Sequence, residues 1–142
     1  MEINEITEKV IGAAIEVHRH LGPGLLESAY EECLCYELNQ AGLRFERQVH
    51  LPIRYKGILL QSAHRMDLVV EEAVVVELKA TEDMPPLYSA QVLTYLRSAQ
   101  IQVGLLINFN VPVLRDGVKR IVNEYLGVPP RLSVSASIRR PL

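Results

Sequence analysis

The run Val74-Val75-Val76-Glu77-Leu78-Lys79 constrains the fold of this chain most. Three consecutive valines are typical of a central strand that is buried on both faces of its sheet. Residues 103–107 form a second, almost wholly apolar run, which predicts a further strand over residues 102–108. Such strands need helices to cover them, so we expect an α/β protein in which helices flank a mixed central sheet.

Apolar residues recur at a spacing of three and four in three other segments. This periodicity predicts helices over residues 4–20, 26–41 and 87–99. Between the second helix and the valine run the period changes to two, which predicts extended segments. These segments are residues 43–49, 50–55, 58–61 and 64–70. The pattern of residues 119–125 predicts a short strand or helix. The predicted order is therefore two helices, four or five strands, a helix, a strand and this short element.

The length of 142 residues is typical of one domain. After Gly127 the chain contains three prolines and few apolar repeats, so we expect a single domain over residues 1–126 and a C-terminal tail over residues 127–142. No stretch approaches the roughly 18 apolar residues of a membrane span. The acidic N-terminus lacks the basic and apolar regions of a signal peptide, so we expect a cytoplasmic protein that does not enter the membrane.

The net charge of −2 is unevenly distributed. Residues 1–42 carry 8 acidic and 2 basic side chains, and residues 43–142 carry 9 acidic and 13 basic ones. The basic second part is compatible with a polyanionic partner, although a solvated surface of mixed sign explains it as well.

Acidic and basic residues interrupt the two strands that should form a hairpin. Glu77 and Lys79 share one face of their strand, while Asp67 and Arg65 share a face of the preceding strand, opposite Met66, Leu68 and Val70. If the strands pair, Asp67, Glu77 and Lys79 converge. Carboxylates are costly to bury unless they are paired or bound to a metal, so this group is either a catalytic site or an ordinary Glu–Lys ion pair at the end of a sheet.

Two helical pairs add to this group. Gln91 and Tyr95 stand four residues apart on the third predicted helix, and Glu27 and Tyr30 stand three apart at the start of the second. Each pair also has a purely structural interpretation. Tyr95 suits the buried face of an amphipathic helix, and an acid in a first turn is favoured by the helix dipole.

Together these residues resemble the GxxExxY protein family, over about residues 4–123. The stretch Gly24-Leu25-Leu26-Glu27-Ser28-Ala29-Tyr30 carries the pattern of that name. The family is similar to small predicted nucleases of the PD-(D/E)xK type, and the Gln91–Tyr95 pair resembles the Gln-x-x-x-Tyr element of their RecB-like members. The resemblance implies a restriction-endonuclease-like fold with a central mixed sheet, flanking helices and two N-terminal helices.

The resemblance also implies roles for individual residues. Asp67, Glu77 and Glu27 would be ligands of Mg²⁺ or Mn²⁺, and Lys79 would be the catalytic lysine. Supporting or substrate-binding roles would fall to four others: Gln91, Tyr95, Tyr30 and Arg65. For Arg65, an ion pair with Asp67 and a contact with phosphate remain equal alternatives.

We therefore expect a metal-dependent nuclease that hydrolyses phosphodiester bonds of DNA or RNA. One alternative is a non-catalytic module that binds nucleic acid or protein on a nuclease-like scaffold, because a fold does not fix a function. A metal-dependent hydrolase of small phosphate esters would use the same residues. A homodimer is compatible with the nuclease interpretation. One small domain covers only a short stretch of nucleic acid, and cutting both strands of a duplex needs two sites.

Overall fold

A computed structural model describes residues 1–124, apart from the side chains of residues 62 and 63. Its elements follow one another in this order: α1 (Ile3–Leu21), α2 (Glu27–Gln40), β1 (Phe45–Tyr55), β2 (Ile58–Val70), β3 (Val74–Lys79), α3 (Pro86–Ala99), β4 (Val103–Asn108), the 3-10 turn η1 (Leu114–Gly117) and β5 (Val118–Val122). All three predicted helices are present with nearly the predicted bounds. The last element is a strand, which resolves the alternative that the sequence left open.

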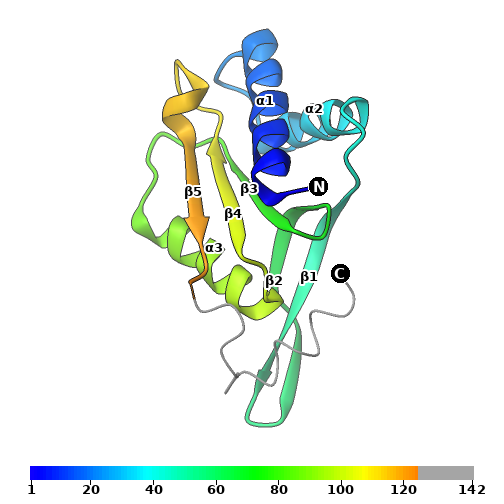
Figure 1. Cartoon of the computed structure of the whole chain (residues 1–142). Coiled ribbons are helices and arrows are strands. Elements are labelled where there is room, and N and C mark those ends of the chain that lie inside the picture. Colours follow the sequence, from blue (N-terminus) through cyan, green and yellow to red (C-terminus); the bar gives the residue numbers. More distant parts are fainter. Residues whose placement is uncertain (125–142) are drawn as a thin grey trace.

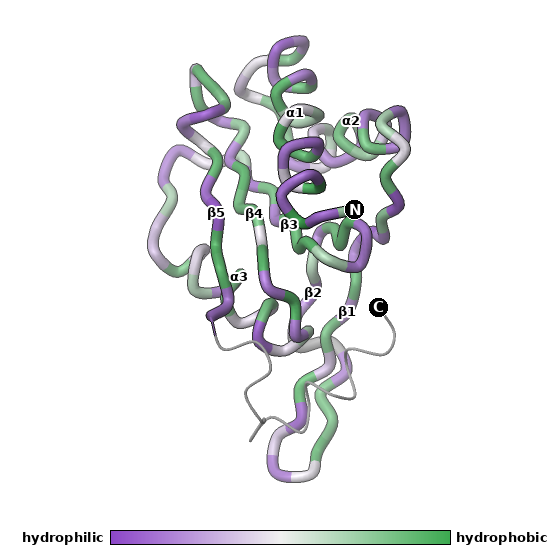
Figure 2. The backbone as a smooth tube through the Cα atoms, viewed as in Figure 1, coloured by the Kyte–Doolittle hydropathy of each residue, from purple (hydrophilic) through white to green (hydrophobic). Residues whose placement is uncertain are grey.

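The strands form one mixed sheet with the order β1-β2-β3-β4-β5 (Figure 1). Neighbouring strands are antiparallel except for β3 and β4, which are parallel and are joined through α3. The expectation of a mixed sheet flanked by helices is confirmed. The two mainly apolar runs became β3 and β4, in which all residues but Lys79 are buried, and their apolar residues are green in Figure 2.

Two hydrophobic clusters cover the two faces of this sheet. Helices α1 and α2 pack on one face, where they meet Val74, Val76 and Leu78 of β3. Helix α3 packs on the other face, where it meets Val75. Alternate residues of one strand thus enter different cores, which is why β3 has no polar face apart from Glu77 and Lys79 at its end.

The segments that the sequence separated into four extended runs form only two long strands. The predicted run 43–49 lies in β1 from residue 45 onward, together with residues 50–55, and residues 58–61 and 64–70 lie in β2. Pro52 is accommodated because β1 is an edge strand and its register with β2 shifts between Leu51 and Ile53. The paired outer parts of β1 and β2 extend away from the helices (Figure 1). We call residues 47–66 the β arm.

The predicted alternation of β2 is wrong at one point. Leu68 and Val70 face α1 and α2, as expected for one face, but Met66 belongs to the cluster on the α3 side. On the neighbouring strand, Gln48 has a positive φ of 52°. This left-handed residue lies between Arg47, which pairs with Leu68, and Val49, which pairs with Met66, so it marks the point where the buried side chains of β2 change from one face of the sheet to the other.

The predicted tail, residues 127–142, lies outside the described residues, and so does the domain boundary at residue 126. Among the helices of residues 1–124, none is long and apolar enough to cross a membrane.

Candidate active site

The candidate site lies at a fork in the sheet, where β2 and β3 separate. The two strands pair only through residues 68–70 and 74–76, and one further step of the same register would place Asp67 opposite Glu77. There, side chains replace the backbone partners. The Asp67 N–H donates to Glu77 Oε1 at 2.8 Å, and the Leu78 N–H donates to Asp67 Oδ2 at 2.9 Å. The fork therefore holds two carboxyl groups together by backbone hydrogen bonds.

Burial and the neighbouring Asp67 both disfavour the charge of Glu77, whereas the interaction with Glu77 favours the charge of Asp67. Glu77 is only 7% exposed, and burial raises its pKa to about 8, with the charge of Asp67 adding to the shift. Burial also raises the pKa of Asp67, although the hydrogen bond from the Leu78 N–H opposes that rise. Burial raises the pKa of Tyr95 on α3, and the charges of Glu77 and Asp67 raise it further, so Tyr95 lies within their field.

Lys79 follows Glu77 on the same face of β3, but the two do not form a close ion pair. Lys79 Nζ instead lies 4.2 Å from the centre of the Tyr88 ring, in a cation–π contact. Its charge lowers the pKa of Glu77 only as a minor cause. Within residues 1–124, neither Asp67 nor Glu77 has a cationic side chain within ion-pair distance. The structural alternative of a Glu–Lys ion pair at the sheet end is therefore wrong.

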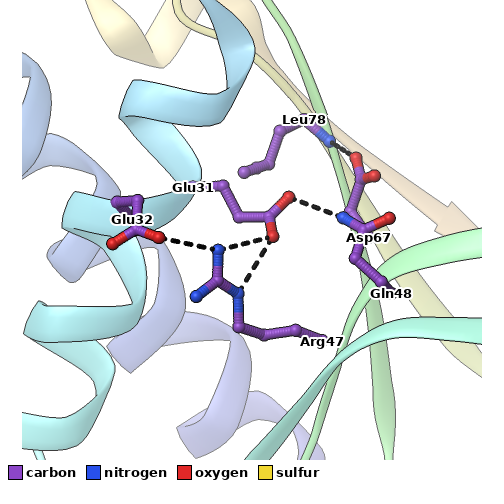
Figure 3. A network of polar contacts seen from close by, with 6 residues as sticks. All are labelled: Glu31, Glu32, Arg47, Gln48, Asp67 and Leu78. Carbon is purple, nitrogen blue, oxygen red and sulfur yellow. Dashed lines mark hydrogen bonds and ion pairs between the residues drawn. The ribbon is translucent and has the colours of Figure 1, made fainter.

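A third acid approaches the fork from α2, and it is Glu31 (Figure 3). Gln48 Nε2 donates to Glu31 Oε1 at 2.8 Å, and Arg47 Nε donates to Glu31 Oε2 at 3.0 Å. The Gln48 side chain also acts on the fork, because it lowers the pKa of Asp67, whereas the charge of Glu31 raises it. Gln48, the residue with positive φ, thus links the α2 acid to the fork.

Glu31 could have been found in the sequence. The buried residues of α2 include Cys35 and Leu38, which stand four and seven positions after Glu31. An acid on the apolar stripe of a helix is costly to bury without a partner, so its position alone marks it as unusual. Gln48 and Arg47 carry no such signal, because their position depends on a twist in β1 that no local pattern predicts.

Glu27 and Tyr30 occupy other positions. Glu27 is exposed in the first turn of α2, and the α2 acid that acts on Asp67 is Glu31. Tyr30 is fully buried, its hydroxyl donates to Gly22 O at 2.6 Å, and the Leu25 N–H donates to the same hydroxyl at 3.1 Å. Tyr30 therefore anchors the connection between α1 and α2.

Tyr30 also supports the fork from behind. Its ring stacks on Phe109 with 4.4 Å between centroids, and the Phe109 N–H donates to Lys79 O at 2.9 Å. The end of β3 is thus tied to the α1–α2 connection through one aromatic pair.

The remaining predicted residues surround the fork on the α3 side or on β2. Tyr95 is buried, and its ring meets the His64 ring edge-on at 5.3 Å. Gln91 lies half-buried one turn before Tyr95, and Arg65 is exposed two residues before Asp67. Arg65 and Asp67 form no ion pair, so that alternative for Arg65 is not the arrangement present.

Comparison with protein-family models identifies the superfamily of this chain. The family model described as the PD-(D/E)XK nuclease superfamily matches residues 4–121. The chain belongs to the PD-(D/E)XK nuclease superfamily. The mixed sheet with helices on both faces is the restriction-endonuclease-like core that we expected.

Other comparisons add less. The crystal structure of SSO0001 is similar to this chain with a TM-score of 0.43 and 16% sequence identity, over 95% of this chain and 82% of that one. No curated protein sequence gave a significant match.

Members of the PD-(D/E)XK superfamily generally use divalent metal ions. Within residues 1–124, no group of three or more His, Cys, Asp or Glu side chains is arranged to hold a metal. The donors at the fork nevertheless fit a hard cation. Mg²⁺ usually binds through one or two carboxylates and keeps its other positions for water and phosphate. Asp67 and Glu77 are two adjacent carboxyl groups with raised pKa values and, among residues 1–124, no cationic side chain within ion-pair distance, so they offer such a pair.

Proposed function

We propose that this protein is a metal-dependent nuclease of the GxxExxY type that hydrolyses phosphodiester bonds in DNA or RNA. The observation that carries the proposal is the pair of adjacent carboxyl groups at the fork. Asp67 and Glu77 are held by backbone hydrogen bonds, lack a cationic partner among the described residues, and stand beside Lys79. An uncompensated buried pair of this kind destabilises the fold, which suggests that it is retained for binding or catalysis.

The metal would be Mg²⁺ or Mn²⁺, held by Asp67, Glu77 and the carbonyl of Leu78. When bound, it would supply positive charge at the scissile phosphate and make a bound water more acidic. We assign the helical acid of the site to Glu31 rather than to Glu27, since Glu31 is buried and acts on Asp67 while Glu27 is exposed.

The other residues of the site would bind and orient the substrate. Lys79 Nζ, held over the Tyr88 ring, is a hydrogen-bond donor only. It would donate to the attacking water or to a phosphate oxygen. Such a donor stabilises the charge that develops on the phosphoryl oxygens. Arg65 is free to reach phosphate from the exposed side of β2, and Gln91 and Tyr95 would support the site from α3.

A nuclease assay tests this proposal directly. The full chain is incubated with labelled single- and double-stranded DNA and RNA in Mg²⁺, Mn²⁺ or EDTA, beside Asp67→Ala and Lys79→Ala. We expect metal-dependent cleavage that falls at least about 100-fold in both variants. The exposed Glu27→Ala is the matched acid control and should retain activity, whereas a loss in Glu27→Ala would restore that residue to the site. Cleavage that survives in Asp67→Ala and Lys79→Ala would contradict the proposal.

A specific observation also favours the alternative of a non-catalytic scaffold. A glutamate with a pKa of about 8 is mostly protonated at neutral pH, so the fork can exist without a metal. If folded protein cleaves no nucleic acid and its melting temperature does not respond to Mn²⁺, a proton on Glu77 takes the place of a metal and the scaffold function is correct. We also propose that the protein is a homodimer, which would allow it to cut both strands. The molecular mass of the same preparation, measured by light scattering, tests this.

A further inference from the structure

The β arm has an unusual distribution of charge. Residues 47–66 contain four Arg or Lys residues, two His residues and no Asp or Glu, although Glu46 and Asp67 stand directly at its two ends. Arg47 forms ion pairs with Glu31 and Glu32. The other three cationic side chains of the β arm, Arg54, Lys56 and Arg65, form no ion pair with the described residues. This acid-free stretch begins at the fork itself.

One face of the arm is fixed to the body of the protein. Leu51 and Met66 are fully buried against the cluster on the α3 side, and His64 meets the Tyr95 ring. On the opposite face, His50 and Arg65 are directly paired across β1 and β2, and both are exposed. The base of the arm therefore presents cationic groups to solvent next to Asp67.

The tip of the arm exposes hydrophobic side chains. Tyr55 is 57% exposed and Ile58 is 59% exposed, and Leu59 and Leu60 beside them are exposed as well. Lys56 Nζ lies 5.4 Å from the centre of the Tyr55 ring. Figure 2 shows hydrophobic and hydrophilic residues interspersed along this part of the chain. An exposed aromatic ring beside cations is the combination by which proteins stack unpaired bases and hold their phosphates.

We propose that the β arm binds a single-stranded segment of nucleic acid next to the fork, with Arg54, Lys56 and Arg65 on phosphates and Tyr55 stacked on a base. This inference rests on the proposed function, since it places the strand that leaves the site along the arm. From Gln48 to Tyr55 the arm spans roughly 25 Å at 3.3 Å per residue. That length offers a contact surface for several nucleotides of an unpaired strand.

Binding to labelled single-stranded DNA and RNA of 20 nucleotides tests the charge on the arm. The full chain is titrated in EDTA, which prevents cleavage, by fluorescence anisotropy between 50 and 200 mM salt. Arg54→Gln/Lys56→Gln removes two charges from the tip. Lys9→Gln/Arg115→Gln removes two exposed charges elsewhere and is the matched control. We expect the tip variant to bind about 10-fold more weakly and its log K against log salt slope to fall by about 1.4, with the control unchanged.

The stacking contact has its own variants. Tyr55→Leu keeps an apolar side chain but removes the ring, and Tyr55→Phe keeps the ring. We expect Tyr55→Leu to bind at least about 5-fold more weakly with an unchanged salt slope, and Tyr55→Phe to bind as the wild type does. Circular dichroism and melting temperature confirm that every variant is folded.

The outcomes separate this inference from the nuclease proposal. Arm-dependent binding without any cleavage by the wild type supports the inference and removes the nuclease function. Cleavage with tip and Tyr55 variants that bind as the control does would overturn the inference and leave the nuclease function in place. It is also overturned if no single strand binds, or if the variants change the molecular mass in solution and not the affinity, because the tip then joins copies of the protein.

Discussion

Glu31 and Glu77 are two glutamates with nearly equal burial, 8% and 7% exposed, in opposite electrostatic settings. Glu31 has a guanidinium and an amide as partners, from Arg47 and Gln48. Glu77 has one backbone N–H and, beside it, a second carboxyl group. The first arrangement neutralises a buried charge within the protein, and the second leaves it for a ligand or a proton to neutralise.

Burial by itself therefore does not show whether the charge of an acid is neutralised within the protein or left for a ligand or a proton. The number and charge of the partners does. The following four predictions test the comparison, in order of decreasing effect on stability.

A change of pH should have the largest effect on the free energy of unfolding of the metal-free protein. The ordinary pKa of glutamate is 4.5 and that of Glu77 is about 8, so the folded state binds the proton more tightly than the unfolded state. The free energy of unfolding should therefore fall as pH rises from about 4.5 to about 8, and should level off above that range. Asp67, whose pKa is also raised, contributes in the same direction.

Thermal melts in EDTA between pH 5 and pH 9 measure this dependence. Glu77→Gln, which cannot ionise, should flatten the dependence of the melting temperature on pH. At pH 9 it should raise the melting temperature by at least about 5 °C, because removal of the buried charge stabilises the folded state by a few kcal/mol. A wild-type profile that rises from pH 5 to pH 8 would show that the fork acids are compensated after all.

Divalent metal should reverse part of this destabilisation. A ligand that binds only the folded protein contributes about 2.7 kcal/mol at a concentration 100 times its Kd. We expect Mn²⁺ to raise the melting temperature of the wild type at pH 8 by several degrees and to leave Asp67→Asn unchanged. Glu46→Gln, an exposed acid on β1, is the control and should respond to Mn²⁺ as the wild type does. An equal shift in Asp67→Asn would place the metal elsewhere.

Glu31→Ala should destabilise the protein by about 1–3 kcal/mol, because it leaves Gln48 and the half-exposed Arg47 without their buried partner. The neighbouring Glu32 also contacts Arg47 but is 71% exposed, so Glu32→Ala should cost less than about 1 kcal/mol. Urea unfolding at pH 7 measures both. Equal effects of the two substitutions would mean that the Glu31 contacts contribute no more than a surface ion pair.

The smallest effect concerns the tyrosine behind the fork. Tyr30→Phe removes the hydroxyl that joins Gly22 and Leu25, and should cost about 1–2 kcal/mol in urea unfolding. The exposed Tyr36→Phe is its control and should be nearly neutral. Tyr30→Phe should keep the Mn²⁺ response, whereas loss of that response would give Tyr30 a direct part in the site.

Much of this protein follows from local pattern. The three helices follow from a spacing of three and four, and β3 and β4 follow from runs that only a doubly covered strand can bury. The approach of Asp67 to Glu77 also follows from the sequence, because a tight turn between two extended runs leaves few registers. These properties depend on residues that are near one another in the chain, and local preferences and strand periodicity are sufficient to predict them.

The environments of Met66, Glu31 and Lys79 depend on contacts between residues that are far apart in the sequence, so only the tertiary structure shows them. The packing of β1, β2 and α2 determines the positive φ of Gln48, the burial of Met66 on the α3 side and the hydrogen bond that Gln48 donates to Glu31, 17 residues away. Glu27 and Glu31 lie one helical turn apart, and the direction in which α2 packs on the sheet determines which of them is buried. Lys79 likewise could pair with Glu77 or lie over Tyr88, and the position of α3 favours the ring. Each of these outcomes depends on how helices and strands pack against one another, and a one-dimensional pattern carries no information about that packing.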